Sequence, residues 1–116
     1  MLFFLIYFLA SAPNSIIVTE VDLSEASGAK IIKRLKHPLY NANSWLIKPA
    51  TTKNGEYLAA PTITGRILIF NLRTGKLTAN LHSHDDCEVR HVAFHQRLPI
   101  MVSCGDDGRI RIYYQM

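Results

Sequence analysis

The stretch "IMVSCGDDGRIRIYYQ" (100–115) holds two short apolar runs on either side of the turn sequence Asp-Asp-Gly (106–108). Asp-Gly between apolar runs is typical of a tight β-hairpin turn, because glycine readily adopts the positive φ that such a turn requires. The alternation in "RIRIY" places Ile110 and Ile112 on one face of the second run. The stretch therefore predicts an antiparallel hairpin rather than a helix.

Two earlier stretches have the same pattern. They are "EYLAAPTITGRILIFNL" (56–72), with the turn Ile-Thr-Gly, and "YFLASAPNSIIVTEVDL" (7–23), with the turn Pro-Asn-Ser. Leu9, Leu58 and Met101 take equivalent places, 49 and 43 residues apart. A sequence period of this size indicates a repeat architecture.

The segments between the hairpins also correspond. Gly28 and Gly75 each lead into a strand-like run, "AKIIKRLK" and "KLTANLH". A further strand follows at 44–49 ("SWLIKP") and at 89–95 ("VRHVAFH"). Four short antiparallel strands per period, with close turns and no clear helical period, predict an all-β fold built from four-stranded propeller blades.

On these residues the chain resembles the WD-repeat β-propeller family. "LHSHDDCEVRHVAFHQRLPIMVSCGDDGRIRIYY" (81–114) is similar to nearly a whole repeat, with Ser-His (83–84) at the Gly-His position and Tyr-Tyr (113–114) at the Trp-Asp position. "FNLRTGK" (70–76) is similar to the end of the previous repeat, with Phe-Asn in place of Trp-Asp.

In this family a His, a Ser or Thr, an Asp and a Trp form a hydrogen-bonded relay that ties the strands of one blade together. Carried over by position, the relay residues of the last repeat are His84, Ser103, Asp107 and, at the Trp place, Tyr113. Such a network satisfies buried polar groups that would otherwise be costly. The same places in the middle repeat hold Pro38, Ala60, Thr64 and Phe70. These residues cannot form the relay, so we expect apolar packing to hold the middle blade.

The resemblance divides the chain into three parts. Residues 1–28 are expected to be a partial blade of one hairpin, 29–75 a WD-like repeat without the relay, and 76–116 a WD-like repeat with most of it. Propellers close with about four to eight blades. The resemblance therefore implies an incomplete β-propeller, the C-terminal segment of a larger one.

The function implied is a non-enzymatic scaffold for protein–protein interaction, without cofactor, metal or small-molecule substrate. Its partners would be other proteins, including the missing blades of its own propeller. Related propellers bind through loops at one end of the central channel, here at 38–45 and 83–90. Aromatic and arginine side chains often dominate interface energy. The candidates for partner binding are Tyr40, Asn43, Trp45, Asp85, Asp86, Glu88 and Arg90.

Two kinds of chemistry compete with this interpretation. His82, His84, Cys87, His91 and His95 are metal-ligand types within 82–95, so a zinc-binding module is an alternative, although their spacing matches no common zinc motif. The types of Ser103, His84 and Asp107 also match a catalytic triad. No Gly-x-Ser-x-Gly sequence surrounds Ser103, and the relay explains all three residues without catalysis.

The first fifteen residues, "MLFFLIYFLASAPNS", leave a further alternative open. A signal sequence with a cleavage site at Ala-Ser-Ala (10–12) would make the chain a short secreted or membrane-anchored β protein. No Lys or Arg precedes the apolar run, which is also shorter than the roughly 20 residues of a membrane span. The match to the other hairpins favours residues 7–11 as a buried strand.

Charge and cysteine content give weaker indications. The formal net charge is +4, and its densest basic run, at 30–36, is too short to predict nucleic-acid binding. Two cysteines, Cys87 and Cys104, are too few to form the disulfide framework of a small secreted protein. We therefore expect an intracellular protein, in the cytoplasm or nucleus, that binds neither nucleic acid nor membrane.

Overall fold

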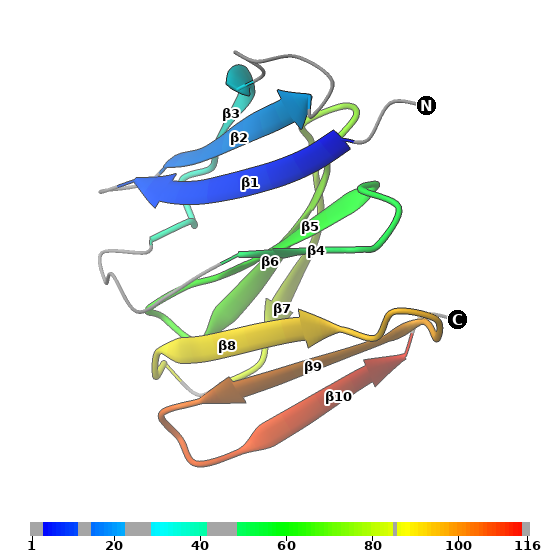
Figure 1. Ribbon diagram of the computed structural model, residues 1–116. Helices are drawn as coiled ribbons and strands as arrows, with labels where there is room; N and C mark the ends of the chain where they lie inside the picture. Colours follow the sequence, from blue (N-terminus) through cyan, green and yellow to red (C-terminus); the bar gives the residue numbers. More distant parts are fainter. Residues whose placement is uncertain (1–3, 12–14, 23–28, 42–48, 85, 115–116) are drawn as a thin grey trace.

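The computed structural model describes residues 4–11, 15–22, 29–41, 49–84 and 86–114. These residues form ten strands and no helix (Figure 1). The strands are β1 (Phe4–Ser11), β2 (Ser15–Asp22), β3 (Ala29–Lys36), β4 (Ala50–Thr51), β5 (Tyr57–Pro61), β6 (Arg66–Asn71), β7 (Leu77–His82), β8 (Val89–Phe94), β9 (Ile100–Gly105) and β10 (Ile110–Tyr114). The predicted all-β fold is confirmed, and the described residues contain no helix of a length and hydrophobicity that would cross a membrane.

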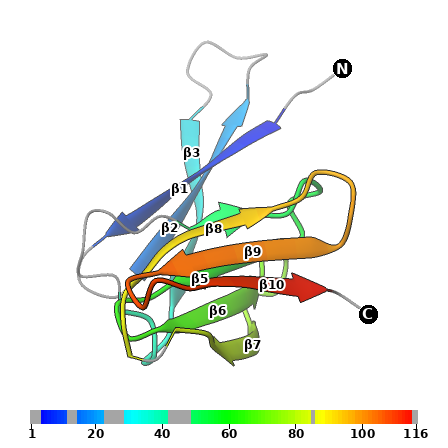
Figure 2. The ribbon, with the colours of Figure 1, turned by 90° about the horizontal axis from the view of Figure 1, so that it is seen from below.

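The described strands form three antiparallel sheets, ordered β1-β2-β3, β4-β5-β6-β7 and β10-β9-β8. They lie one above another in Figure 1, and Figure 2 views the stack from the third sheet. Strands β4 and β5 contact β8, which brings the inner strands of the second and third sheets together. The arrangement is that of adjoining blades in an incomplete β-propeller.

The sheets are offset from the sequence repeats. The first strand of each repeat pairs with the preceding hairpin: β3 pairs with β2, and β7 pairs with β6. The predicted boundaries, between residues 28 and 29 and between residues 75 and 76, therefore separate sequence repeats. The boundaries between the sheets lie later in the chain, after β3 and after β7. The strand expected at 44–49 falls mostly outside the described residues, and β4 begins at Ala50.

The hairpins are close to those predicted from the sequence. Strand β1 contains the predicted strand at 7–11 and begins three residues earlier, at Phe4. Gly65 and Gly108 have φ values of 83° and 74°, so both turns use the positive φ expected of glycine.

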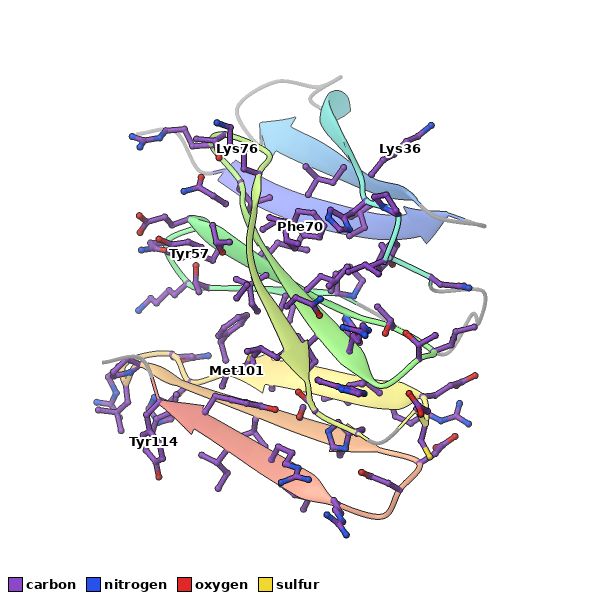
Figure 3. All side chains as sticks on the ribbon, turned by 180° about the vertical axis from the view of Figure 1, so that it is seen from behind. Lys36, Tyr57, Phe70, Lys76, Met101 and Tyr114 are labelled. Carbon is purple, nitrogen blue, oxygen red and sulfur yellow. The ribbon has the colours of Figure 1, made fainter. Side chains whose placement is uncertain are left out.

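Two apolar cores separate the sheets because β5 and β6 bury side chains on both faces. Between the first and second sheets lie Ile16, Leu35, Tyr40, Leu58, Ala60, Leu68, Phe70 and Leu72. Between the second and third lie Ala59, Ile67, Val89, Val92 and Met101. Phe70 and Met101 are labelled in these two layers in Figure 3. Ala60 and Phe70, which hold the relay places of the middle repeat, are thus both core residues.

Candidate partner-binding surface

The connection between β7 and β8 is fixed by backbone hydrogen bonds at one end of the sheets, on the left in Figure 1. Ser83 and His84 both donate their N–H groups to the carbonyl of Gly65, at 2.9 and 3.0 Å. The N–H of Val89 donates to the carbonyl of Thr62, at 3.0 Å. These bonds hold the connection against the β5–β6 turn of the neighbouring sheet.

His84 is fully buried and hydrogen-bonded through both ring nitrogens. Its Nδ1 lies 2.9 Å from Oδ1 of Asp107, in the β9–β10 turn, and its Nε2 lies 2.8 Å from Oγ of Ser103, on β9. The N–H of Arg109 also donates to Oδ1 of Asp107, at 3.0 Å. His84 therefore lies within hydrogen-bonding distance of two of the other expected relay residues, Ser103 and Asp107.

The fourth expected member, Tyr113, bonds elsewhere. Its hydroxyl group hydrogen-bonds Oγ of Ser83, the residue before His84. Tyr113 pairs with Met101 in the strand register, while Ser103 pairs with Arg111. The hydroxyl group lies at the tip of the long tyrosine side chain, and it hydrogen-bonds Ser83 instead of Ser103.

The glycine at position 105 was not singled out from the sequence, yet it makes room for the relay. A Cβ atom at Gly105 would lie 2.7 Å from Cγ and 2.8 Å from Nδ1 of His84. The buried ring of His84 therefore packs directly on the backbone of β9.

Opposing effects act on the pKa of Asp107. Burial alone raises it, but the hydrogen bonds from His84 and the N–H of Arg109 outweigh burial and hold the pKa below its ordinary value. The folded state therefore stabilises the charged carboxylate.

This shift predicts a pH dependence of stability. A carboxyl group with a lowered folded-state pKa stabilises the fold above its unfolded pKa, and the contribution is lost as pH falls through the folded pKa. We expect the free energy of unfolding to fall on acidification below about pH 4, and to fall less steeply in Asp107→Asn. Urea unfolding of the wild-type and Asp107→Asn chains between pH 6 and 3 measures how steeply the free energy of unfolding changes with pH in each. Parallel pH profiles would contradict the assignment.

The triad-like arrangement of Ser103, His84 and Asp107 is closed to substrate. The exposed fraction is 0% for His84 and 1% for Ser103. A nucleophilic hydroxyl group must reach the reacting atom, and burial keeps that of Ser103 from contact with a substrate. The geometry supports the structural role over the catalytic one.

The candidate zinc ligands are not gathered into one site. Both ring nitrogens of His84 are taken by Ser103 and Asp107, and Nδ1 of His95 accepts the N–H groups of Arg97 and Leu98. Across the described part of the chain, no three His, Cys, Asp or Glu residues are placed to hold a metal ion. The geometry thus gives no support to a zinc site within 82–95.

An ion-pair cluster lies on the surface beside the relay. Arg90 donates to both carboxylate oxygens of Asp106, from Nε at 2.7 Å and Nη2 at 2.9 Å. Its Nη1 lies 3.1 Å from Oε2 of Glu88. Through its hydrogen bond with Arg90, Asp106 has a pKa below its ordinary value, and the pKa of Arg90 is raised. Asp106 was missed in the sequence because its partner is 16 positions away.

The other residues predicted to bind a partner differ in their exposure to solvent. The prediction for Tyr40 is wrong: its exposed fraction is 1%, it packs in the first core, and burial raises the pKa of its hydroxyl group to about 12. Asp86 is on the surface, with a side chain 91% exposed and a φ of 56°. Asn43, Trp45 and Asp85 lie outside the described residues.

Comparison with known proteins gives the same fold. Residues 75–114 match the family described as WD40, "WD domain, G-beta repeat". The Ribosome biogenesis protein BOP1 homolog of Caenorhabditis elegans is 32% identical over 65 residues, which are 56% of this chain and 10% of that protein. The chain therefore spans about a tenth of the length of this relative.

Solved structures are similar over nearly the whole chain. The β-propeller domain of Cps50 (Swd1) from Myceliophteria thermophila has a TM-score of 0.75 at 22% identity, covering 94% of this chain and 36% of that one. The structure of U3-55K has a TM-score of 0.67 at 23% identity, covering 93% and 32%. At these identities the likeness shows the fold alone.

The stacked antiparallel sheets define a β-propeller segment. The matched repeat narrows the class: residues 75–114 match a WD repeat, and the fold is that of a β-propeller segment. WD-repeat propellers are generally non-catalytic and generally mediate protein–protein interactions.

Proposed function

We propose that the chain is a non-enzymatic scaffold for protein–protein interaction, and that the β7–β8 connection and the β9–β10 turn bind its partner. The observation that carries this proposal is the fixed, charged end of the third sheet. There Arg90 and Asp106 form a two-point ion pair at the surface, directly beside the buried relay. An ordered surface costs less entropy on binding than a flexible one.

The charge of this end suggests the chemistry of the partner. Asp86, Glu88, Asp106 and Asp107 supply four carboxylates, while Arg90 and Arg109 supply two guanidinium groups, and Arg90 already contacts Glu88 and Asp106. The surface is therefore acidic, although the whole chain has a formal net charge of +4. We expect a partner segment rich in Lys or Arg, since complementary charge speeds and orients association.

The relative from C. elegans suggests the process. Its name places that protein in ribosome biogenesis, and we propose that this chain serves the same process inside the cell. The proposal gives the chain a binding role in that process.

The test compares charge changes at the two ends of the sheets. Asp86→Asn removes the exposed charge but keeps a residue that tolerates positive φ, and Asp86→Lys reverses the charge. Glu56→Gln and Glu56→Lys, at an exposed position beyond β4, are the matched controls. We expect affinity purification with quantitative mass spectrometry to show proteins reduced about fivefold or more by Asp86→Lys, less by Asp86→Asn, and unchanged in both controls. An identical set of bound proteins in all variants would contradict the proposal.

A further inference from the structure

The β5–β6 turn joins two connections into one continuous surface. On one side the N–H of Ile63 donates to the carbonyl of Asn41, at 2.9 Å, in the connection after β3. On the other side the carbonyls of Thr62 and Gly65 accept N–H groups from the β7–β8 connection and the start of β8. Both connections lie at the same end of the sheets, on the left in Figure 1. Residues 37–41 therefore belong to the same ordered end as the ion-pair cluster.

Leu39 is an exposed apolar side chain in a fixed position. Its exposed fraction is 40%, and the neighbouring Pro38 is also exposed. The N–H of Leu39 donates to Nδ1 of His37 at 3.1 Å, and the N–H of Tyr40 donates to the carbonyl of His37 at 2.9 Å. The ring of His37 meets that of Phe70 edge-on, with 6.4 Å between the ring centroids, and Tyr40 is buried in the first core. Leu39 therefore faces solvent between two anchored residues.

The two connections differ in charge although they take equivalent places in successive repeats. "HPLYN" (37–41) contains no carboxylate, whereas "SHDDCE" (83–88) contains three. Lys36, exposed at the end of β3, adds a positive charge beside the first connection. This end of the sheets thus has an apolar part around Leu39 and an acidic part around Asp86, and a basic ligand side chain is favoured only at the acidic part.

The spacing of the two parts sets the spacing of side chains in the ligand. The first connection leads into the second sheet and the equivalent one leads into the third, so they are one sheet apart. Packed sheets lie about 10 Å apart, and an extended chain advances about 3.3 Å per residue. An extended ligand therefore crosses from the apolar to the acidic part in about three residues.

We infer that this end of the sheets binds an extended partner segment with an aliphatic residue and, about three positions away, one or more Lys or Arg residues. The aliphatic side chain packs on Leu39, and the basic side chains contact Asp86 and its acidic neighbours. Burial of apolar surface provides affinity, and charge provides orientation. The inference rests on the function proposed above and adds the apolar point of contact.

The test uses the full chain and two fluorescein-labelled peptides. The first joins a pair of leucines to a pair of arginines through two serines, and the second has serine in place of both leucines. We expect fluorescence anisotropy at low salt to show that Leu39→Ser weakens binding of the first peptide about fivefold and leaves that of the second unchanged. Asp86→Lys should weaken binding of both peptides about fivefold or more.

Two further variants serve as controls. Leu98 is 54% exposed, but it lies between β8 and β9, at the other end of the sheets, so Leu98→Ser should bind both peptides as the wild-type chain does. Leu39→Met keeps an apolar side chain and should retain binding of the first peptide. Equal urea midpoints for all variants and the wild-type chain would show that the fold is kept.

Three results would overturn the inference. An equal loss of affinity for both peptides in Leu39→Ser would show that Leu39 does not contact the leucines. Unchanged binding in Leu39→Ser, with weaker binding in Asp86→Lys, would leave the acidic part as the whole site and the proposed function intact. Self-association that Leu39→Ser abolishes, measured by sedimentation velocity, would show that a second copy of the chain covers Leu39. If neither peptide bound, or neither substitution altered binding, the function proposed for this surface would fail as well.

Discussion

Replacing Gly65 with alanine is expected to lower the free energy of unfolding by about 3–4 kcal/mol. Gly65 has a φ of 83°, and an added Cβ atom would lie 2.4 Å from the carbonyl oxygen of His84 and 2.8 Å from the backbone nitrogen of Asp86. Both contacts are with backbone, which cannot move aside without breaking the hydrogen bonds from Ser83 and His84 to Gly65.

Gly108 is the matched control for this substitution. Its φ of 74° is nearly the same, but a Cβ atom there meets nothing within 4 Å. Gly108→Ala should therefore cost about 1 kcal/mol, from the backbone conformation alone. Urea unfolding followed by circular dichroism compares the two variants, and equal losses of stability would show that the approach of the β7–β8 connection to Gly65 does not matter.

Replacing His84 with alanine should lower the free energy of unfolding by about 3 kcal/mol. The substitution empties a fully buried site and removes the hydrogen-bond partner of Ser103 and one partner of Asp107. Ser103→Ala, which removes one bond and leaves Nε2 of His84 unpaired, should cost about 1–2 kcal/mol.

His91 provides the control for this second prediction. It is exposed on β8, so His91→Ala should change stability by no more than about 0.5 kcal/mol. Denaturant titrations of the three variants give the ranking. If His84→Ala were no more destabilising than His91→Ala, the relay would have no part in holding the third sheet together.

The hairpins were predicted well from the sequence because the features that specify them involve residues close together in the chain. Alternating apolar residues and Asp-Gly or Thr-Gly turns depend on neighbours in the chain, and the strands and the positive φ of Gly65 and Gly108 agree with them. The repeated pattern also identified the residues around His84, since the resemblance aligned them by position. The hydroxyl group of Tyr113 escaped this reasoning because its partner depends on how far the side chain reaches.

The candidate surface was less predictable from sequence. Tyr40 was chosen for its aromatic ring, and the same ring places it in the core, because only packing decides whether an aromatic side chain faces solvent or other sheets. Asp106 was overlooked although it pairs with Arg90, since two residues 16 positions apart become neighbours only when β8 and β9 pair.

The sequence by itself determined most of the strands, their turns and the repeat, because periodicity and turn chemistry are properties of consecutive residues. The resemblance to the WD-repeat family added the residues around His84. The tertiary structure alone decided which strands share a sheet, the burial of Tyr40 and the Arg90–Asp106 pair. Each of these depends on contacts between segments far apart in the chain, and the free energy of such contacts is set by packing and by distance in space.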